Sequence, residues 1–204
     1  MCIKVLIPVC IGLLFYGFTF GQCPDRDSLW KKLVFLRDSS TLSSSEKLKE
    51  LLYYKDLIKS CAYRFDSTHA LLLQRIGATY FYETDYLKAA QYMQQSINMI
   101  NTNADKPSIN IKHNIRNYYS LGWICDSLNN VTQKMKYLDS CIALAMKYNA
   151  VSSYLVNSLF AKVEYFFNVG DYQQCINYAT ICERYARQYA GNARKNEYLD
   201  WIDI

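Results

Sequence analysis

The feature of this sequence that most constrains its fold is a segment that recurs along the chain. Its clearest copy is RIGATYFYETDYLKAAQYMQQSI, Arg75 to Ile97, in which apolar residues recur every three or four positions. A shift that places Ile76 on Leu121 aligns the segment with a second copy without a gap, and a shift that places Asp85 on Asp171 gives a third. This spacing is the period of an amphipathic helix, and self-similarity at an interval of this size indicates a repeated structural unit. The sequence therefore predicts stacked helical hairpins.

Helix boundary signals divide the chain into four hairpins. In the clearest copy, Asp66-Ser67-Thr68 offers an N-cap for the first helix and Thr84-Asp85 offers one for the second. The polar stretch from Asn101 to Asn110, with Pro107, is expected to end the second helix. A weaker copy precedes it, with the Ser/Thr-rich turn from Asp38 to Ser44 between its helices. We expect an all-α solenoid with hairpins at about residues 26–61, 67–100, 114–148 and 152–190, and a C-terminal helix at 194–204.

The order of residues in these copies resembles the tetratricopeptide repeat (TPR), a helix-turn-helix unit of about 34 residues. Cys125 and Lys134 depart from the pattern in the second clear copy, Val163 replaces the glycine in the third, and the family's closing proline is missing from every copy. The resemblance implies a right-handed superhelix in which the first helices line a concave face. In the clearest copy the matching positions, assigned to packing within and between hairpins, are Leu73, Ile76, Gly77, Tyr80, Ala89, Met93 and Ser96.

The resemblance also implies a groove on the concave face, where such repeats bind extended peptides or partner helices. Aromatic side chains exposed on such a face are the residue types that dominate binding energy. The alternative interpretation is that longer helices bury several of these side chains between hairpins. The candidate groove residues are Gln74, Ala78, Phe81 and Tyr82 in the clearest copy, Arg116, Tyr119, Trp123 and Asp126 in the next, and Phe160, Glu164 and Phe167 in the last.

The first 21 residues predict a secretory signal peptide. Lys4 precedes an apolar run from Val5 to Phe20, and cleavage is expected after Gly21, which leaves residues 22–204 as a secreted or periplasmic domain with no membrane segment. One alternative is an uncleaved membrane anchor, although the run is shorter than the ~20 residues that a spanning helix needs. The other alternative is a lipoprotein modified at Cys23, where Gln22 occupies a position that prefers a small residue.

The cysteines outside the signal segment fall into two groups. Cys23 and Cys61 flank the first predicted hairpin, whose antiparallel helices bring them to the same end, so they are either a disulfide in an oxidising compartment or two free thiols. Cys125, Cys141, Cys175 and Cys182 form no C-x-x-C pair, and most of them stand at repeat positions that need a small residue. We therefore expect this second group to serve packing.

No sequence motif indicates catalysis or cofactor binding. The chain lacks G-x-S-x-G, P-loop, G-x-G-x-x-G and H-E-x-x-H patterns, and neither His69 nor His113 has ligands at metal-site spacing. Loss of Lys4 with the signal segment lowers the net charge of +5 by one unit, which is too mild to indicate nucleic acid. We expect a non-enzymatic scaffold, without cofactor, that binds a peptide or partner protein; its oligomeric state is left open.

A second hypothesis treats the repeats as the sensory or regulatory arm of a longer protein. The arrangement of signal peptide and repeats resembles bacterial proteins in which such repeats precede a caspase-like peptidase (CHAT) domain or a membrane sensor kinase. In that case the catalytic domain lies outside these 204 residues.

Overall fold

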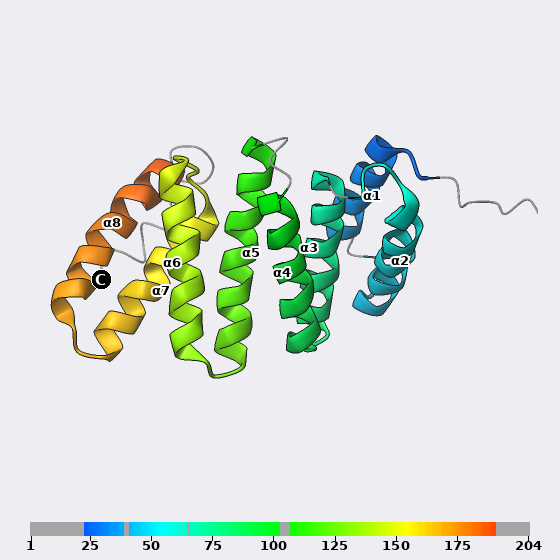
Figure 1. Ribbon diagram of the computed structural model, residues 1–204. Helices are drawn as coiled ribbons and strands as arrows, with labels where there is room; N and C mark the ends of the chain where they lie inside the picture. The colour runs from blue at the N-terminus through cyan, green and yellow to red at the C-terminus, as the bar shows by residue number, and fades with distance from the viewer. Residues whose placement is uncertain (1–22, 39–40, 65, 103–106, 191–204) are drawn as a thin grey trace, which may run out of the picture.

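The computed structural model describes residues 23–38, 41–64, 66–102 and 107–190, in which the chain is all-α (Figure 1). The predicted signal peptide and the predicted helix at 194–204 lie outside these residues. No strand occurs in the described ranges. The helices are α1 (Arg26–Asp38), α2 (Ser44–Leu57), the short 3₁₀ helix η1 (Ile58–Ser60), α3 (Ser67–Tyr82), α4 (Tyr86–Thr102), α5 (Pro107–Ser127), α6 (Val131–Lys147), α7 (Ser153–Asn168) and α8 (Tyr172–Ala190).

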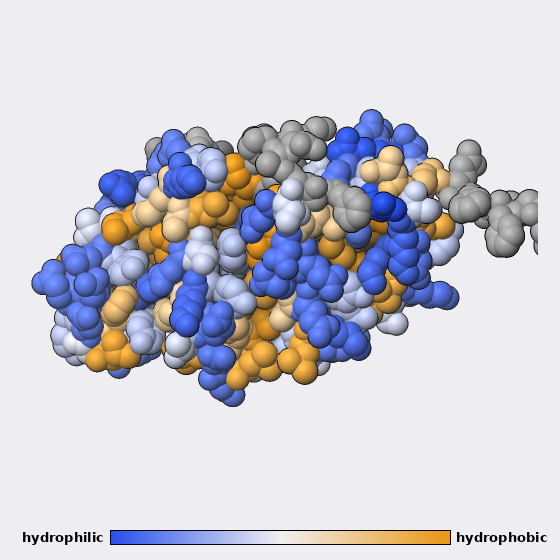
Figure 2. All heavy atoms as spheres, viewed as in Figure 1, coloured by the Kyte–Doolittle hydropathy of each residue, from blue (hydrophilic) through white to orange (hydrophobic). Residues whose placement is uncertain are grey.

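The helices follow one another in a solenoid-like row of adjacent pairs. Three hairpins, α3–α4, α5–α6 and α7–α8, pack closely along their length, and each contacts the next (Figure 1). The first pair is more open, because α1 and α2 both lie against α3 and approach each other less closely. Figure 2 shows hydrophilic residues over much of the visible face, with patches of apolar residues among them. Among the described residues, clusters of buried apolar side chains follow one another from α1 to α8, so the hydrophobic core is distributed along the row of helices.

The first helices of successive hairpins lie next to one another. Close backbone contacts join α1 to α3, α3 to α5, and α5 to α7. Within the described part of the chain, successive second helices show no equally close approach. A row of hairpins whose first helices are closer together than their second helices curves toward the first helices. The first helices therefore line the inner face, which is the arrangement that the resemblance implied.

The three close hairpins share one turn geometry. The residue just before the N-cap of each second helix has a positive φ, and the N-cap amide that follows donates a hydrogen bond to a carbonyl at the end of the first helix. These positions are Thr84 (φ 61°), Asn129 (φ 55°) and Gly170 (φ 78°); the bonds run from Asp85 to Tyr80 (3.0 Å), Asn130 to Cys125 (2.8 Å) and Asp171 to Phe166 (3.0 Å). The same Asp or Asn side chain accepts from a backbone N–H in the first turn of the helix that follows, each at 3.1 Å. Of the two adjacent residues Thr84 and Asp85 that the sequence offered as an N-cap, Asp85 is the one that caps α4.

The helices of two hairpins approach closely at a glycine. A Cβ atom added at Gly77 would lie 2.9 Å from Met93 Cγ and 3.0 Å from the Ala89 carbonyl oxygen. At the equivalent Gly122, an added Cβ would lie 2.9 Å from Leu138 Cδ2. A side chain at either position would therefore overlap its neighbours, which confirms the packing role assigned to Gly77 and gives Gly122 the same role.

The start of the third hairpin corrects the sequence prediction. The stretch from Asn101 to Asn110 was expected to separate two hairpins, with the third beginning at residue 114. Instead, α4 ends at Thr102 and α5 begins at Pro107. Proline tolerates the first turn of a helix because an amide at that position has no intrahelical partner. Pro107 therefore begins a helix here.

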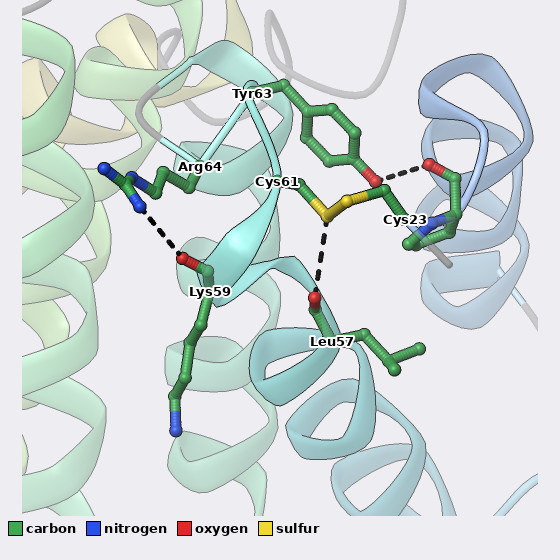
Figure 3. The surroundings of a disulfide bond; sticks show 7 residues. Cys23, Leu57, Lys59, Cys61, Tyr63 and Arg64 are labelled. Carbon is green, nitrogen blue, oxygen red and sulfur yellow. Dashed lines mark hydrogen bonds between the residues drawn. A yellow bond between two sulfur atoms is a disulfide. The ribbon is translucent and has the colours of Figure 1, made fainter. Parts of the chain in front are cut away.

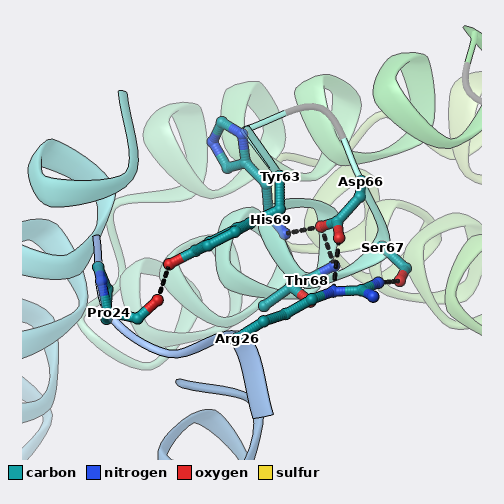
Figure 4. Close-up of polar contacts among 7 residues, drawn as sticks. All are labelled: Pro24, Arg26, Tyr63, Asp66, Ser67, Thr68 and His69. Carbon is teal, nitrogen blue, oxygen red and sulfur yellow. Dashed lines mark hydrogen bonds and ion pairs between the residues drawn. The ribbon is translucent and has the colours of Figure 1, made fainter. Parts of the chain in front are cut away.

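A disulfide and an ion pair hold the segment at the start of α1 to the segment that connects η1 with α3. Cys23 is bonded to Cys61, with the two Cα atoms 5.7 Å apart, and the Tyr63 hydroxyl donates to the Pro24 carbonyl at 2.5 Å (Figure 3). Arg26 in α1 pairs with Asp66 at 2.7 Å, and Asp66 also caps α3 by accepting from the Thr68 amide at 2.7 Å (Figure 4). Of the two states that the sequence left open for these cysteines, the structure has the disulfide.

Candidate binding groove

A hollow of about 430 Å³ crosses the inner face of the solenoid. It spans the last turns of α3, the middle of α5 and the first turn of α7. Its volume lies in the range of ligand pockets, which are roughly 300–1,000 Å³. The lining residues are Ala78, Phe81, Tyr82, Met93, Arg116, Tyr119, Ser120, Trp123 and Tyr154.

Aromatic rings make up much of this lining and support one another. The Tyr119 ring lies edge-on to Trp123, with centroids 6.1 Å apart, and contacts the Tyr154 ring at 5.3 Å. Phe81 and Tyr82 form a second edge-to-face pair at 6.0 Å. Tyr82 is 74% exposed and Trp123 is 42% exposed, so both offer large apolar surfaces to a ligand. Side chains of this kind provide contact area at a low cost in conformational entropy.

Arg116 supplies a positive charge beside these rings. Its guanidinium carbon lies 5.8 Å from the centre of the Tyr154 ring, and among the described residues it forms no ion pair. A second, smaller hollow of about 90 Å³ adjoins the first and shares Ala78, Tyr82 and Arg116 with it. Arg116 therefore stands between the two hollows.

A lysine of the neighbouring helix packs on Trp123 and pairs with a carboxylate of α5. Lys134 of α6 has its ammonium nitrogen 5.4 Å from the centre of the Trp123 ring and 2.8 Å from a carboxylate oxygen of Asp126. The Lys134 side chain is only 17% exposed. This cation is therefore held between the ring and the carboxylate.

Two predicted groove residues in the first helices have other roles. Gln74 is 1% exposed and lies between α3 and α5, where its side-chain nitrogen donates to Asn117 Oδ1 at 3.0 Å. Its assignment to the groove was wrong, because the residue lies on the side of α3 that packs against the next hairpin. Asp126 is directed toward Lys134 and does not line the hollow. The predicted residues that the structure does bring together are Ala78, Phe81, Tyr82, Arg116, Tyr119 and Trp123.

The predicted groove residues of the last hairpin lie outside the hollow. Phe160 is half-buried and packs against the core that α5 to α8 share. Glu164 is exposed, and so is Phe167, whose ring contacts Tyr172 of the next helix at 6.1 Å. The hollow instead includes Tyr154, which the sequence prediction missed.

Tyr154 belongs to the groove because the groove runs diagonally across the first helices. The groove lies against the C-terminal end of α3, at Ala78 to Tyr82, and against the first turn of α7. A prediction made position by position within the repeat assumes a groove perpendicular to the helices. The only signal for Tyr154 in the sequence is an aromatic residue just after the N-cap Ser152.

Burial shifts the pKa values of several titratable groups near the groove and in the neighbouring core. Burial raises the pKa of the Cys141 and Cys182 thiols to about 11, so both are protonated at neutral pH. Burial, with the nearby charges of Arg75 and Arg116, lowers the pKa of His113 to about 4, and this imidazole is therefore neutral at pH 7. In the described residues no three His, Cys, Asp or Glu side chains are placed to hold a metal ion.

Comparison with known proteins gives no family for this chain. No model of a protein family matches it, and no curated protein is significantly similar to it in sequence. Among the helices that the structure describes, none combines the length and apolar character that crossing a bilayer requires.

Proposed function

We propose that this protein is a TPR-like scaffold that binds a peptide segment of a partner in the groove formed by Phe81, Tyr82, Arg116, Tyr119 and Trp123. The observation that carries the proposal is that three successive first helices contribute to one hollow lined by aromatic rings and an arginine. Such a surface has the composition of binding hot spots, which are enriched in Trp, Tyr and Arg. The partner is either a separate protein or another domain of a longer polypeptide.

Equivalent contacts in separate hairpins support the comparison with TPR units. Tyr80 stacks on Tyr92 with centroids 5.6 Å apart, and at the equivalent positions Phe166 stacks on Tyr178 at 5.3 Å. The Ser96 hydroxyl donates to the Ala70 carbonyl at 2.8 Å; at the equivalent positions the Cys182 thiol lies 3.7 Å from the Val156 carbonyl oxygen. These contacts recur because each hairpin packs its small and aromatic residues in the same register.

The compartment proposed for this scaffold is the periplasm or the exterior of the cell. Structural disulfides persist in oxidising compartments and are rare in the cytosol. The bond between Cys23 and Cys61, next to the predicted signal peptide, is the feature that supports this location.

Site-specific photo-crosslinking tests the groove. A photoreactive phenylalanine derivative replaces either Tyr82, which is 74% exposed and lines the hollow, or Phe167, which is 62% exposed and lies outside it. After exposure to a periplasmic extract, a partner protein should cross-link at position 82 and not at position 167. Adding Trp123→Ala to the position 82 variant should remove that product.

Two results would count against this proposal. One is equal cross-linking at positions 82 and 167, which would mean that any exposed aromatic position captures the partner. The other is a product at position 82 that Trp123→Ala does not reduce, although circular dichroism shows the variant folded. Either result would place the binding surface elsewhere on the molecule.

A further inference from the structure

We infer that the segment bound in this groove is rich in proline and lies across Tyr82 and Trp123 as an extended polyproline II helix, with backbone carbonyl oxygens accepting from Arg116. The inference rests on the proposed function, because it specifies the chemistry of the ligand for the same groove. Three properties of the groove carry it, namely the direction of its hydrogen bonds, the arrangement of its aromatic rings and its length.

The polar side chains of the groove offer mainly hydrogen-bond donors. Arg116 and Trp123 carry N–H groups and have no side-chain acceptor. The described lining holds no carboxylate, amide or imidazole side chain. Its other polar side chains are hydroxyl groups, each of which can also donate: Tyr82, Tyr119, Ser120 and Tyr154. A ligand bound here therefore needs acceptors, and it finds few partners for donors of its own.

The donors of the groove are available in the folded chain. Arg116 makes no hydrogen bond or ion pair with another described residue; its guanidinium carbon instead lies 5.8 Å from the centre of the Tyr154 ring. The planar guanidinium can donate to a ligand from its edge while its face remains on the ring. The Tyr119 hydroxyl accepts from the side-chain nitrogen of Asn157 at 3.4 Å, so its own hydrogen remains to be donated.

Proline is the residue whose backbone matches a surface of donors. Every other residue brings one N–H for each carbonyl, and an N–H covered by this lining would lose water without gaining an acceptor. Proline has the carbonyl and no N–H. In a polyproline II helix the backbone makes no internal hydrogen bonds, so the carbonyl oxygens stay available to a binding partner. A proline-rich segment therefore supplies acceptors without unpaired donors.

The aromatic rings of the groove suit the compact apolar rings of proline. The rings of Tyr119 and Trp123 meet at 72°, and those of Phe81 and Tyr82 meet at 70°. Each pair therefore turns ring faces in two directions and forms angled surfaces instead of one flat wall. Grooves lined by aromatic residues recognise polyproline II segments in several unrelated domains, because a segment that is already extended loses little conformational entropy on binding.

The length of the groove sets the length of the segment. The groove crosses the three first helices α3, α5 and α7. Packed helices lie roughly 8–10 Å apart, so the groove is on the order of 20 Å long. A polyproline II helix rises about 3.1 Å per residue, and about six residues would therefore cover the groove.

Binding of synthetic peptides to the whole chain, with its disulfide intact, tests the inference. The probe is a peptide of about eight prolines with blocked ends and an uncharged fluorophore, long enough to cover the groove. In matched peptides, alanine, sarcosine or glutamate replaces alternate prolines. By fluorescence polarisation, the proline peptide should bind at least about tenfold more tightly than the alanine peptide, because each alanine restores an N–H without a partner. The sarcosine peptide lacks both the N–H and the ring, so its affinity should fall between these two.

Three variants of the protein locate the bound peptide. Trp123→Ala should weaken binding of the proline peptide at least about tenfold, and Arg116→Met, which keeps an apolar stem and has no donor, should also weaken it. Phe167→Ala removes an exposed ring outside the hollow and should leave the affinity unchanged. Circular dichroism checks that each variant is folded. Because the peptide is uncharged, added salt should change its affinity by less than about twofold.

The outcomes distinguish this inference from the function on which it rests. If a partner cross-links at position 82 but the proline peptide binds no better than the alanine peptide, the proline assignment is wrong and the groove remains the binding site. Tighter binding of the glutamate peptide would replace the assignment by an acidic ligand. Equal losses in Trp123→Ala and Phe167→Ala would place the peptide outside the groove. If neither the peptide nor a partner engages position 82, both the groove and the inference built on it fail.

Discussion

Replacing Gly77 by alanine should destabilise the fold, whereas the same change at Gly122 should have little effect. At position 77 the added methyl group would lie 2.9 Å from Met93 Cγ and 3.0 Å from the Ala89 carbonyl oxygen. The Met93 side chain can rotate away, but the carbonyl belongs to the backbone of α4, which must shift as a unit. At position 122 the overlap at 2.9 Å is with the Leu138 side chain alone, and the nearest backbone atom of α6, the Lys134 carbonyl oxygen, is 3.8 Å away.

Two opposing effects set the size of the change at Gly77. Overfilling a packed core costs roughly 1–3 kcal/mol, while alanine is favoured over glycine within a helix by up to about 1 kcal/mol. The net loss at Gly77 should therefore be about 1–2 kcal/mol in the free energy of unfolding. At Gly122 the rotation of one leucine costs less, so the two effects should nearly cancel, to within about 0.5 kcal/mol.

Urea unfolding followed by circular dichroism measures this difference. For a chain of this size, each kcal/mol should also lower the melting temperature by about 2–4 °C. Gly122→Ala is the matched control, because it makes the same substitution at the equivalent position of the next hairpin. If Gly77→Ala is as stable as wild type, or if Gly122→Ala loses more stability, then close approach of the two backbones is not what requires glycine in this repeat.

Three further predictions concern the cysteines and His113. Reducing the bond between Cys23 and Cys61, which are separated by 38 positions, should lower stability by up to about 4 kcal/mol, and hydrogen exchange should rise first in α1. Between pH 6.5 and about 4 the unfolded state protonates His113 while the folded state does not. The free energy of unfolding should therefore decrease by at most about 3.4 kcal/mol as the pH is lowered through this window, and His113→Phe should flatten that part of the profile. In the native protein iodoacetamide should modify the partly exposed Cys175 before Cys182, whose pKa burial raises to about 11; equal rates by mass spectrometry would contradict the packing.

The repeated hairpin was predictable because its signals are local. An N-cap such as Asp85, a glycine opposite a large side chain and a helical period of apolar residues each depend on neighbours within one hairpin. Even Val163, which departs from the repeat, agrees with this logic. The shift that places Asp85 on Asp171 also places Gly77 on Val163 and Met93 on Ala179. The small and the large residue have therefore exchanged helices, while the total side-chain volume at the two positions is conserved.

The start of α5 could not be read from the sequence in the same way. Pro107 among polar residues is compatible with both the end of one helix and the start of the next. Which of the two occurs depends on whether the residues that follow Pro107 include some that pack, as a helix, against the neighbouring helices. Asn114 and Ile115, buried at 4% and 2% exposure, show that the face of α5 that packs against its neighbours begins well before the glycine of this hairpin.

The position of the groove depends on how one hairpin lies against the next, and a buried polar chain at that junction shows why. Gln74 of α3 donates to Asn117 of α5 at 3.0 Å, and Asn117 donates to Ser96 of α4 at 2.9 Å. Ser96 in turn donates to the Ala70 carbonyl at 2.8 Å, so a shift of α5 along α3 would leave buried polar groups without partners. These hydrogen bonds therefore fix the position of α5 along α3. In this position Gln74 is buried between the two helices, and Phe81 and Tyr82 lie in the same hollow as Arg116. A sequence pattern confined to one hairpin cannot predict these contacts between hairpins. It does identify the aromatic residues that the packing of α5 against α3 brings together.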